Sequence, residues 1–324
     1  MDNNKRPMVS VIVTTYNHEK YISQTLDSIL MQKVDFEYEI IVHDDASPDR
    51  TSRIIRRYEE KYPNVIKAIY QEENQYSKGE SIQRFYIDYL RGKYIAICEG
   101  DDYWTDSEKL QKQVDFLENN SKYIATAHNV RVIDENYEEI DDRLHPYKKF
   151  DRYIYKFEDA INYKLPSQLA SLVYRNIWRE LDDRIIDLYR DCKTNGDQKL
   201  AVLLTNFGDI YCFEDIMADH RKIVSQGTSW SARTYNKNMS YFIYNSILEI
   251  NNFVDNAFGI TAENKKLRKK VYTSALFKYI KKPTKENKKV VQEINKIKQE
   301  SFLELYLYLI YRIIYWPLRK LKGN

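Results

Sequence analysis

Short apolar segments alternate with helix-like segments along the first hundred residues of the chain. Four runs rich in apolar, β-branched residues have the composition of buried strands and lie at residues 8–15, 38–43, 65–70 and 93–98. Three intervening segments repeat apolar residues every three or four positions, as one face of a helix does, and lie at residues 22–30, 50–61 and 82–89. This alternation predicts βαβ units and an α/β fold with a mostly parallel central sheet.

The pattern changes in the second half of the chain. Residues 134–163 are polar and irregular. A strand or short helix, a helix and a strand are then predicted at residues 167–174, 199–206 and 209–213. Later residues have a helical pattern that Pro283 divides. We therefore expect an α/β domain over residues 1–226 and a helical region over residues 227–324.

The formal net charge of +3 hides a difference between the two ends of the chain. Residues 278–324 carry ten Lys and two Arg against four Glu, a net of +8, so the first 277 residues carry −5. A basic tail on a mildly acidic body indicates an anionic surface as partner, although a solvated helical tail would have the same composition. No nucleic-acid-binding motif accompanies this charge, so we expect no nucleic-acid partner.

Cysteine usage and hydropathy predict the compartment. Cys98, Cys192 and Cys212 are widely spaced, which favours neither a disulfide framework nor a zinc site. Polar residues 1–7 lack the pattern of a signal peptide, and no stretch of 18 residues is uninterruptedly apolar. We expect a cytoplasmic protein, peripheral on the inner face of the cell membrane if its basic tail binds lipid.

Polar side chains gather where three of the predicted strands end. Residues 14–17, the pair Asp44-Asp45, and residues 99–102 each follow an apolar run. The carboxyl ends of parallel strands lie at one edge of a sheet, where ligands bind in folds of this class. The three clusters are therefore expected to converge on one site.

The last of these clusters, Glu99-Gly100-Asp101-Asp102, places three acids within four residues. Carboxylates this close repel one another unless a cation or hydrogen-bond donors offset their charge. Mn²⁺ or Mg²⁺ takes oxygen ligands and commonly bridges to substrate phosphates, and Gly100 would let the backbone approach such a ligand. An acidic surface turn is the alternative, and the nearby clusters disfavour it.

The pair Asp44-Asp45 precedes Ser47 and Asp49, which are typical helix-capping residues. Capping accounts for those two residues but not for two carboxylates at the edge of the sheet. A carboxylate there could accept hydrogen bonds from a base N–H or a ribose hydroxyl.

Three stretches together resemble glycosyltransferase family 2. They are residues 9–17 (VSVIVTTYN), similar to its opening strand, residues 44–51 (DDASPDRT), similar to its second nucleotide-binding motif, and residues 92–104 (GKYIAICEGDDYW), similar to its metal-binding DXD region. The resemblance covers residues 7–230 and implies the GT-A fold. It also implies inverting transfer of a sugar from a nucleoside diphosphate donor, usually UDP.

The resemblance implies a role for each residue at the strand ends. The nucleotide pocket would include Thr14, Thr15 and Tyr16, with Asp45, beside Asp44, at the uracil edge. The acidic turn would place Glu99 toward the ribose and Asp101 on Mn²⁺ or Mg²⁺ between the phosphates, with Gly100 and Asp102 in support. The metal would offset the charge that develops on the leaving diphosphate.

Inversion also needs a base to take the proton of the acceptor hydroxyl. Asp197, after Gly196 and before a predicted helix, matches the place of the family's catalytic Asp, although a helix N-cap is the alternative. Residues 217–221 resemble the segment that precedes a metal-binding His, but Ile223 occupies that place here. His220 would either bind the metal from a shifted position or hydrogen-bond locally.

Two basic residues are candidates for the diphosphate. Arg221 would contact it or pair with Asp215. Lys78, in the loop before the third predicted helix, is the second candidate.

Residues 302–321 are predicted to form an amphipathic helix. Its apolar face would carry Leu303, Leu307, Ile310, Ile314 and Leu318. Its aromatic and flanking basic residues suit the headgroup region of an anionic membrane. A helix packed on the protein or in a homodimer is the alternative.

These features together predict a metal-dependent inverting glycosyltransferase. By family analogy, its acceptor is a lipid-linked glycan in bacterial surface polysaccharide synthesis. A catalytically inactive binding module of the same fold is an alternative, but it predicts a damaged acidic set, whereas Asp45, Asp101 and Asp197 are all present. A nucleotidyltransferase is a further alternative, but it would open with a Gly-rich phosphate loop, and residues 4–17 contain no Gly.

Overall fold

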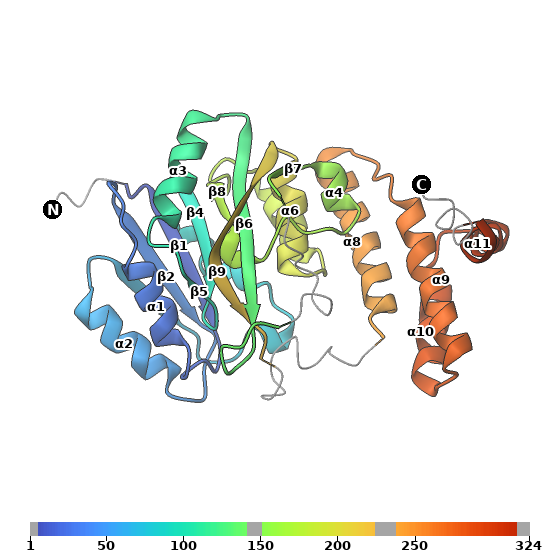
Figure 1. Ribbon diagram of the computed structural model, residues 1–324, viewed down its shortest axis with the longest axis horizontal. Helices are drawn as coiled ribbons and strands as arrows, with labels where there is room; N and C mark the ends of the chain where they lie inside the picture. Colours follow the sequence, from blue (N-terminus) through green and yellow to red (C-terminus); the bar gives the residue numbers. More distant parts are fainter. Residues whose placement is uncertain (1–5, 141–150, 224–237, 316–324) are drawn as a thin grey trace. The chain divides into compact units, whose positions relative to one another are not determined.

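The computed structural model describes residues 6–140, 151–223 and 238–315 (Figure 1). They form two compact units. The α/β unit comprises residues 1–160, 164–192 and 196–223, and the helical unit comprises residues 161–163, 193–195 and 224–324. The predicted boundary at residues 226 and 227 lies outside the described residues.

The first part of the α/β unit alternates strands and helices. In chain order its elements are β1 (Val9–Thr15), α1 (Ile22–Leu30), β2 (Tyr38–Asp44), α2 (Thr51–Lys61), β3 (Ile66–Tyr70), the 3₁₀ helices η1 (Tyr76–Lys78), η2 (Ile82–Phe85) and η3 (Ile87–Tyr89), and β4 (Tyr94–Glu99). The predicted helix at residues 82–89 is thus wrong, because two 3₁₀ turns replace it. Aromatic and β-branched side chains are weak helix formers, and they dominate this segment.

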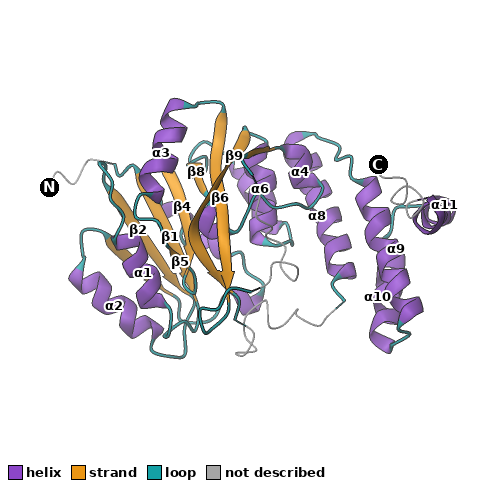
Figure 2. Ribbon diagram, in the orientation of Figure 1, coloured by secondary structure: helices purple, strands orange, loops and turns teal. Residues whose placement is uncertain are grey.

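The second part of the unit is less regular. Its elements are β5 (Tyr103–Trp104), α3 (Lys109–Asn119), β6 (Tyr123–Ile133), β7 (Tyr153–Tyr155), α4 (Phe157–Ile161), η5 (Leu169–Ser171), β8 (Val173–Arg175), α5 (Asp183–Asp191), α6 (Gly196–Thr205) and β9 (Asp209–Arg221). The strands form one sheet, drawn in orange in Figure 2. The ambiguous segment at residues 167–174 contains both a 3₁₀ turn and the start of a strand.

The sheet joins a parallel half to a mixed half. Among the described residues it has nine strands, in the order β3-β2-β1-β4-β8-β6-β9-β5, with β7 pairing β9. Strands β3, β2, β1 and β4 are parallel, whereas β8 runs antiparallel to both β4 and β6. The long strands β6 and β9 pair in parallel, side by side in Figure 1. The predicted α/β fold class is confirmed, and the parallel prediction holds for its first four strands.

Strand register brings the predicted polar clusters level with one another. Thr14 of β1 lies opposite His43 of β2 and Glu99 of β4. The chain continues this contact beyond the strands, since the N–H of Asp45 donates to the Thr15 carbonyl (3.0 Å). The three clusters therefore meet at one edge of the sheet, as the parallel pattern predicts.

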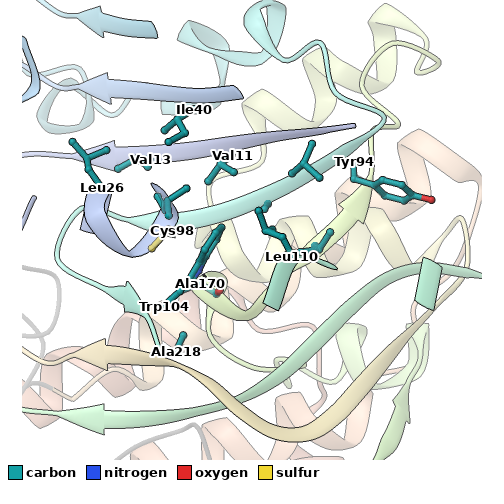
Figure 3. Packing of buried hydrophobic residues seen from close by; sticks show 14 of the residues in the cluster. Val11, Val13, Leu26, Ile40, Tyr94, Cys98, Trp104, Leu110, Ala170 and Ala218 are labelled. Atoms are coloured by element: carbon teal, nitrogen blue, oxygen red, sulfur yellow. Dashed lines mark hydrogen bonds between the residues drawn. The ribbon is translucent and has the colours of Figure 1, made fainter. Parts of the chain in front are cut away.

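The main core lies against this sheet (Figure 3). Val11, Val13 and Ile40 of the strands are fully buried together with Leu26 of α1. Trp104, directly after the acidic turn, packs into the same cluster, and its indole N–H donates to the Ala170 carbonyl (3.0 Å). The acidic turn is thus held between the core and η5.

The helical unit contains α8 (Ser240–Phe258), α9 (Lys265–Lys281), α10 (Lys285–Ile297), α11 (Phe302–Ile310) and a π-helical turn, η6 (Tyr311–Tyr315). Pro283 falls between α9 and α10, as the sequence predicts. Its core includes a buried ion pair, because Arg268 donates to Glu300 (2.7 Å), which also accepts from Tyr244. None of the described helices is both long and apolar enough to cross a membrane.

Candidate nucleotide-sugar site

The loop after β1 is held by side chains that follow β2. Three consecutive backbone N–H groups donate across the gap: Asn17 to Ser47 (2.9 Å), His18 to Thr51 (2.9 Å) and Glu19 to Asp49 (3.0 Å). Ser47 and Asp49 therefore stabilise the neighbouring loop, a role that the expectation of helix capping does not include. The half-buried Thr14 and Tyr16 and the buried Thr15 lie on this joined edge.

Asp44 and Asp45 are both buried and accept hydrogen bonds from the chain around them. Asp44 accepts from the hydroxyl of Ser47 (2.5 Å) and from Ser52. The two oxygens of Asp45 accept from the backbone N–H groups of Gln75 (2.8 Å) and Tyr76 (3.0 Å). Asp45 thereby anchors the loop after β3 at the edge of the sheet. Its contact with a uracil edge remains a prediction.

Lys78 lies on the loop that Asp45 anchors. Its ammonium group pairs with Glu73 of the same loop, and the Lys78 side chain is 51% exposed. Lys78 is therefore paired with an exposed carboxylate and not with the acids at the strand ends.

Gly100 is required by packing within the protein. A Cβ at this position would lie 2.5 Å from Oγ1 of Thr15 and 2.9 Å from Nδ1 of His18. The Gly100 N–H donates to the carbonyl of Thr14 (2.9 Å). The close approach that we expected for a ligand is thus made by the β1 loop.

Gln168 joins the two ends of the acidic turn, and its side chain is 2% exposed. Its amide nitrogen donates to Glu99 (2.8 Å) and to Asp102 (2.7 Å). Its amide oxygen accepts from the N–H of Ala170 (2.5 Å). One neutral side chain therefore fixes the separation of the half-buried Glu99 carboxyl group and the buried Asp102 carboxyl group.

Asp102 accepts two further hydrogen bonds on the side of β9. Nδ1 of His220 lies 3.1 Å from both Asp102 oxygens, and the N–H of Arg221 donates to Oδ1 (2.7 Å). Asp102 is 1% exposed. It is surrounded by donors, so its place in the structure is that of a support for the turn.

The acids of the turn lie in an environment that disfavours negative charge. Burial, reinforced by the charges of Asp102 and Asp101, raises the pKa of Glu99 to about 8. Burial also raises the pKa of Asp101, although His18, whose Nε2 lies 3.7 Å away, opposes the shift. Burial lowers the pKa of His220, but the charge and hydrogen bond of Asp102 outweigh it and raise that pKa to about 9.

The carboxylate oxygens of this turn are the kind of ligand that a hard divalent cation takes. Burial and mutual repulsion raise the pKa values of Glu99 and Asp101, and a cation bound beside them would oppose that shift. Within the described residues, no group of three or more His, Cys, Asp or Glu side chains is arranged to hold an ion. Mg²⁺ and Mn²⁺ are commonly bound through one or two carboxylates together with substrate phosphates, and Asp101, 20% exposed, could supply one such ligand. His220 would have to bind through Nε2, because Nδ1 faces Asp102.

Arg221 is 2% exposed and lies beneath the acidic turn. Its guanidinium group donates to the carbonyl of Asp101 (3.0 Å) and to Gln24 (2.9 Å), with its carbon 4.6 Å from the centroid of the Tyr21 ring. The predicted alternative of a pair with Asp215 is wrong, since Asp215 is exposed and Arg221 is bonded elsewhere. Nη1 has no hydrogen-bond partner among the described residues and retains its donors.

Asp197 lies in the first turn of α6 and accepts from the N–H of Gln198 (2.8 Å). Burial raises the pKa of its carboxyl group. Asp197 and Gln168 line the same cleft, together with Leu165, Pro166, Ser167, Leu169, Leu172 and Ala201. The charge of Asp197 also contributes to the raised pKa of Glu99. The structure therefore brings Asp197 to the acidic turn although 95 residues separate them.

A family model described as glycosyl transferase family 2 matches residues 10–183, which is more than half of the chain. The chain belongs to this family. Ile223 occupies the position where the resemblance to family 2 leads us to expect a metal-binding His, and it is 3% exposed.

Curated relatives match this chain only in part. An uncharacterised protein of Mycobacterium tuberculosis is 40% identical over 131 residues, covering 40% of this chain and 36% of that protein. A Bacillus subtilis protein named for glycosyl transfer in teichuronic acid biosynthesis is 37% identical over 115 residues, covering 35% and 43%. A poly(ribitol-phosphate) beta-glucosyltransferase of Bacillus spizizenii is 36% identical over 118 residues, covering 36% and 18%. The matches span less than half the length of each of these curated relatives.

A solved structure shares the fold. S. aureus TarS, crystallised as residues 1–349 with UDP-GlcNAc, superposes with a TM-score of 0.59 at 20% identity, covering 87% of this chain and 78% of that chain. This likeness, with the family match, confirms the GT-A type of α/β fold.

Two residues of the site carry no motif in the sequence. Gln168 lies in a segment that fits strand and helix equally, so nothing in its pattern indicates a buried clamp. His18, beside Asp101, directly follows the first motif. The place of His18 just before α1 is explained by a structural role as well as by a role in ligand binding. Only the closeness of its ring to Asp101 favours ligand binding.

Proposed function

We propose that this chain is a metal-dependent inverting glycosyltransferase that moves a sugar from a UDP-sugar to a hydroxyl group of a glycan. The observation that carries the proposal is that Asp197 and Gln168 line one small cleft, because Gln168 also holds Glu99 and Asp102 of the acidic turn. In this proposal the base lies next to the nucleotide-sugar, as a direct displacement requires.

Each predicted site residue has a role in this proposal. The nucleotide contacts Thr14, Thr15, Tyr16, Asp44 and Asp45 at the strand ends, and Glu99 faces the ribose. Asp101, supported by Gly100 and Asp102, binds Mn²⁺ or Mg²⁺, with His220 as a second ligand. Arg221, whose buried Nη1 has no hydrogen-bond partner among the described residues, and Lys78, on the loop that Asp45 anchors, interact with the diphosphate. Positive charge at these places offsets the charge of the leaving group.

The reaction requires one proton transfer and one exchange of bonds. Asp197 accepts the proton of the acceptor hydroxyl, whose oxygen bonds to the anomeric carbon as the bond from that carbon to the diphosphate oxygen breaks. Attack opposite the leaving group inverts the anomeric configuration. Burial raises the pKa of Asp197, which makes its ionised form a stronger base. When bound, a divalent cation would neutralise charge on the diphosphate.

The donor and acceptor classes are supported by similar proteins. TarS was crystallised with UDP-GlcNAc, and two relatives are named for teichuronic acid biosynthesis and for glucosylation of poly(ribitol phosphate). We therefore propose a UDP-sugar donor and a bacterial surface polysaccharide as product. We further propose that the acceptor is lipid-linked and that the chain works at the inner face of the cell membrane.

Two variants separate donor binding from transfer. Asp101→Ala should abolish both metal-dependent UDP binding, measured by calorimetry, and release of UDP from a UDP-sugar. Asp197→Asn should keep UDP binding and reduce transfer by about 100-fold or more, the usual contribution of a general base. Asp187→Asn on α5, where the carboxylate is 71% exposed, is the matched control and should leave both unchanged. Full transfer by a correctly folded Asp197→Asn protein contradicts the assigned base.

A further inference from the structure

Helix α11 turns its charged and polar side toward the rest of the helical unit. Glu304 pairs with Lys265 (2.5 Å) on α9. In the turn that follows, Arg312 donates to the hydroxyls of Thr273 (2.7 Å) and Ser274 (3.0 Å), also on α9. Leu305 is the one α11 residue that is fully buried within the described part of the chain. The contact between α11 and α9 is thus made largely by ion pairs and hydrogen bonds.

The apolar side of α11 is left exposed. Large fractions of five apolar side chains are accessible, namely Phe302 (79%), Leu303 (64%), Tyr306 (52%), Leu307 (56%) and Ile313 (54%). Residues 302, 303, 306 and 307 are spaced by one, three or four positions, and residue 313 follows six positions later across the π-helical turn. This spacing puts all five on one side of the helix. The rings of Phe302 and Tyr306 lie stacked, with centroids 6.4 Å apart and planes at 10°. We call these five residues the α11 face.

This arrangement is the reverse of that in an ordinary surface helix, which buries its apolar side and exposes its polar side. A contiguous exposed patch of this kind marks a surface that binds something. The sequence alone did not decide whether this helix binds a membrane or packs against protein. The exposure of the α11 face argues against its packing on the described part of the helical unit.

Charge distinguishes between two occupants of the α11 face. Residues 240–315 carry fourteen Lys and Arg against seven Asp and Glu, a net charge of +7. Two copies that met through this unit would bring like charges together, whereas an anionic lipid surface would be attracted. Exposed Lys266 and Lys270 belong to α9, the helix on which α11 lies. Ile280, 62% exposed on α9, adds a further apolar side chain to the unit.

We propose that the α11 face inserts into the headgroup region of an anionic bilayer and anchors the helical unit there. Phe, Tyr and Leu side chains suit that depth, and the neighbouring Lys side chains reach lipid phosphates. The anchor gives the proposed transferase a membrane-bound acceptor, but membrane binding itself does not depend on transfer.

Vesicle flotation of the full chain tests this anchor. The chain should float with vesicles of phosphatidylcholine and phosphatidylglycerol, and much less with phosphatidylcholine alone. The double variant Leu303→Glu/Leu307→Glu should lose at least tenfold in vesicle affinity. The matched control Met31→Glu/Ile216→Glu adds the same charge at exposed apolar positions of the α/β unit, 40% and 42% accessible, and should bind as the wild type does.

UDP binding, measured on the same proteins, separates this proposal from the proposed function. Unchanged UDP binding in the double variant with loss of flotation supports the anchor, whether or not transfer is ever detected. Flotation of the double variant equal to that of the wild type overturns it. Failure of the wild-type chain to bind anionic vesicles also overturns the proposal. If the wild type then forms a concentration-dependent dimer that Leu303→Glu/Leu307→Glu disrupts, the α11 face binds a second copy.

Discussion

Replacement of Gln168 by Leu isolates the clamp on the acidic turn. Leu has nearly the volume of Gln but can neither donate to Glu99 and Asp102 nor accept from Ala170. At 2% exposure, water cannot take over these bonds without opening the cleft. The variant therefore leaves the half-buried Glu99 and the buried Asp102 without a shared donor.

The expected loss of stability follows from these contacts. A hydrogen bond to a charged group contributes about 1.5–3 kcal/mol and one to a neutral group about 0.5–1.5 kcal/mol. Because the raised pKa of Glu99 leaves its carboxyl group mostly protonated at neutral pH, Gln168→Leu should lower the free energy of unfolding by about 2–4.5 kcal/mol. In a unit of this size, each kcal/mol shifts the melting temperature by about 2–4 °C. A fall on the order of 10 °C is expected.

Urea unfolding without divalent metal, followed by tryptophan fluorescence, measures this loss. Gln111→Leu is the matched control, since Gln111 makes its hydrogen bonds on the exposed side of α3 and should shift the free energy of unfolding by less than about 0.5 kcal/mol. Gln168→Glu should be at least as damaging as Gln168→Leu, because it adds a third carboxyl group between Glu99 and Asp102. A Gln168→Leu protein as stable as the Gln111→Leu control would refute the clamp.

Two further predictions concern the support of the same turn. Burial lowers the pKa of Lys109, which lies against Trp104, from 10.5 to about 7. Between those values the unfolded chain binds a proton that the folded chain has lost, so the free energy of unfolding should rise with pH by about 5 kcal/mol across that window. Lys109→Met should remove this rise, and Lys112→Met on the same helix should keep it. Urea titrations of both variants between pH 6 and 10 measure the free energy of unfolding. Equal slopes of that free energy against pH would contradict the lowered pKa of Lys109. Gly100→Ala, whose Cβ would lie 2.5 Å from Thr15, should cost about 1–3 kcal/mol and weaken UDP binding. Gly196→Ala, which meets only the flexible Gln83 amide at 3.2 Å, is its control, and an equal effect of the two in thermal unfolding would count against the packing argument.

Periodicity could predict the half of the fold that carries the proposed nucleotide site. Apolar runs separated by helical spacing determine a parallel sheet, and the sheet determines that residues 14–17, 44–45 and 99–102 meet. The mixed half of the sheet was harder to predict from the sequence. Strand β8 has only three residues, and its place between β4 and β6 depends on long-range pairing. Element boundaries there depend on tertiary contacts that no local pattern contains.

The same limit applies to the site. Asp101 and Asp197 could be proposed from motifs, but Gln168 is 69 residues from Glu99 and 66 from Asp102, and no spacing connects them. Gly100 was expected to make room for a ligand, and only the structure shows that Thr15 and His18 occupy the space a Cβ would need. Arg221 was assigned two partners from its sequence, and the structure supplies Gln24 and a backbone carbonyl in place of Asp215.

The central claim is that the acidic turn, with Asp197 beside it, transfers a sugar from a UDP donor. The most direct measurement is release of nucleoside diphosphate from a panel of UDP-, GDP- and TDP-sugars, with Mn²⁺, Mg²⁺ or EDTA present and a membrane lipid extract as acceptor source. The account predicts UDP release from at least one UDP-sugar, dependent on a divalent metal and absent in both Asp101→Ala and Asp197→Asn. Failure of every UDP-sugar with either metal, in a folded chain that also does not bind UDP, would contradict it.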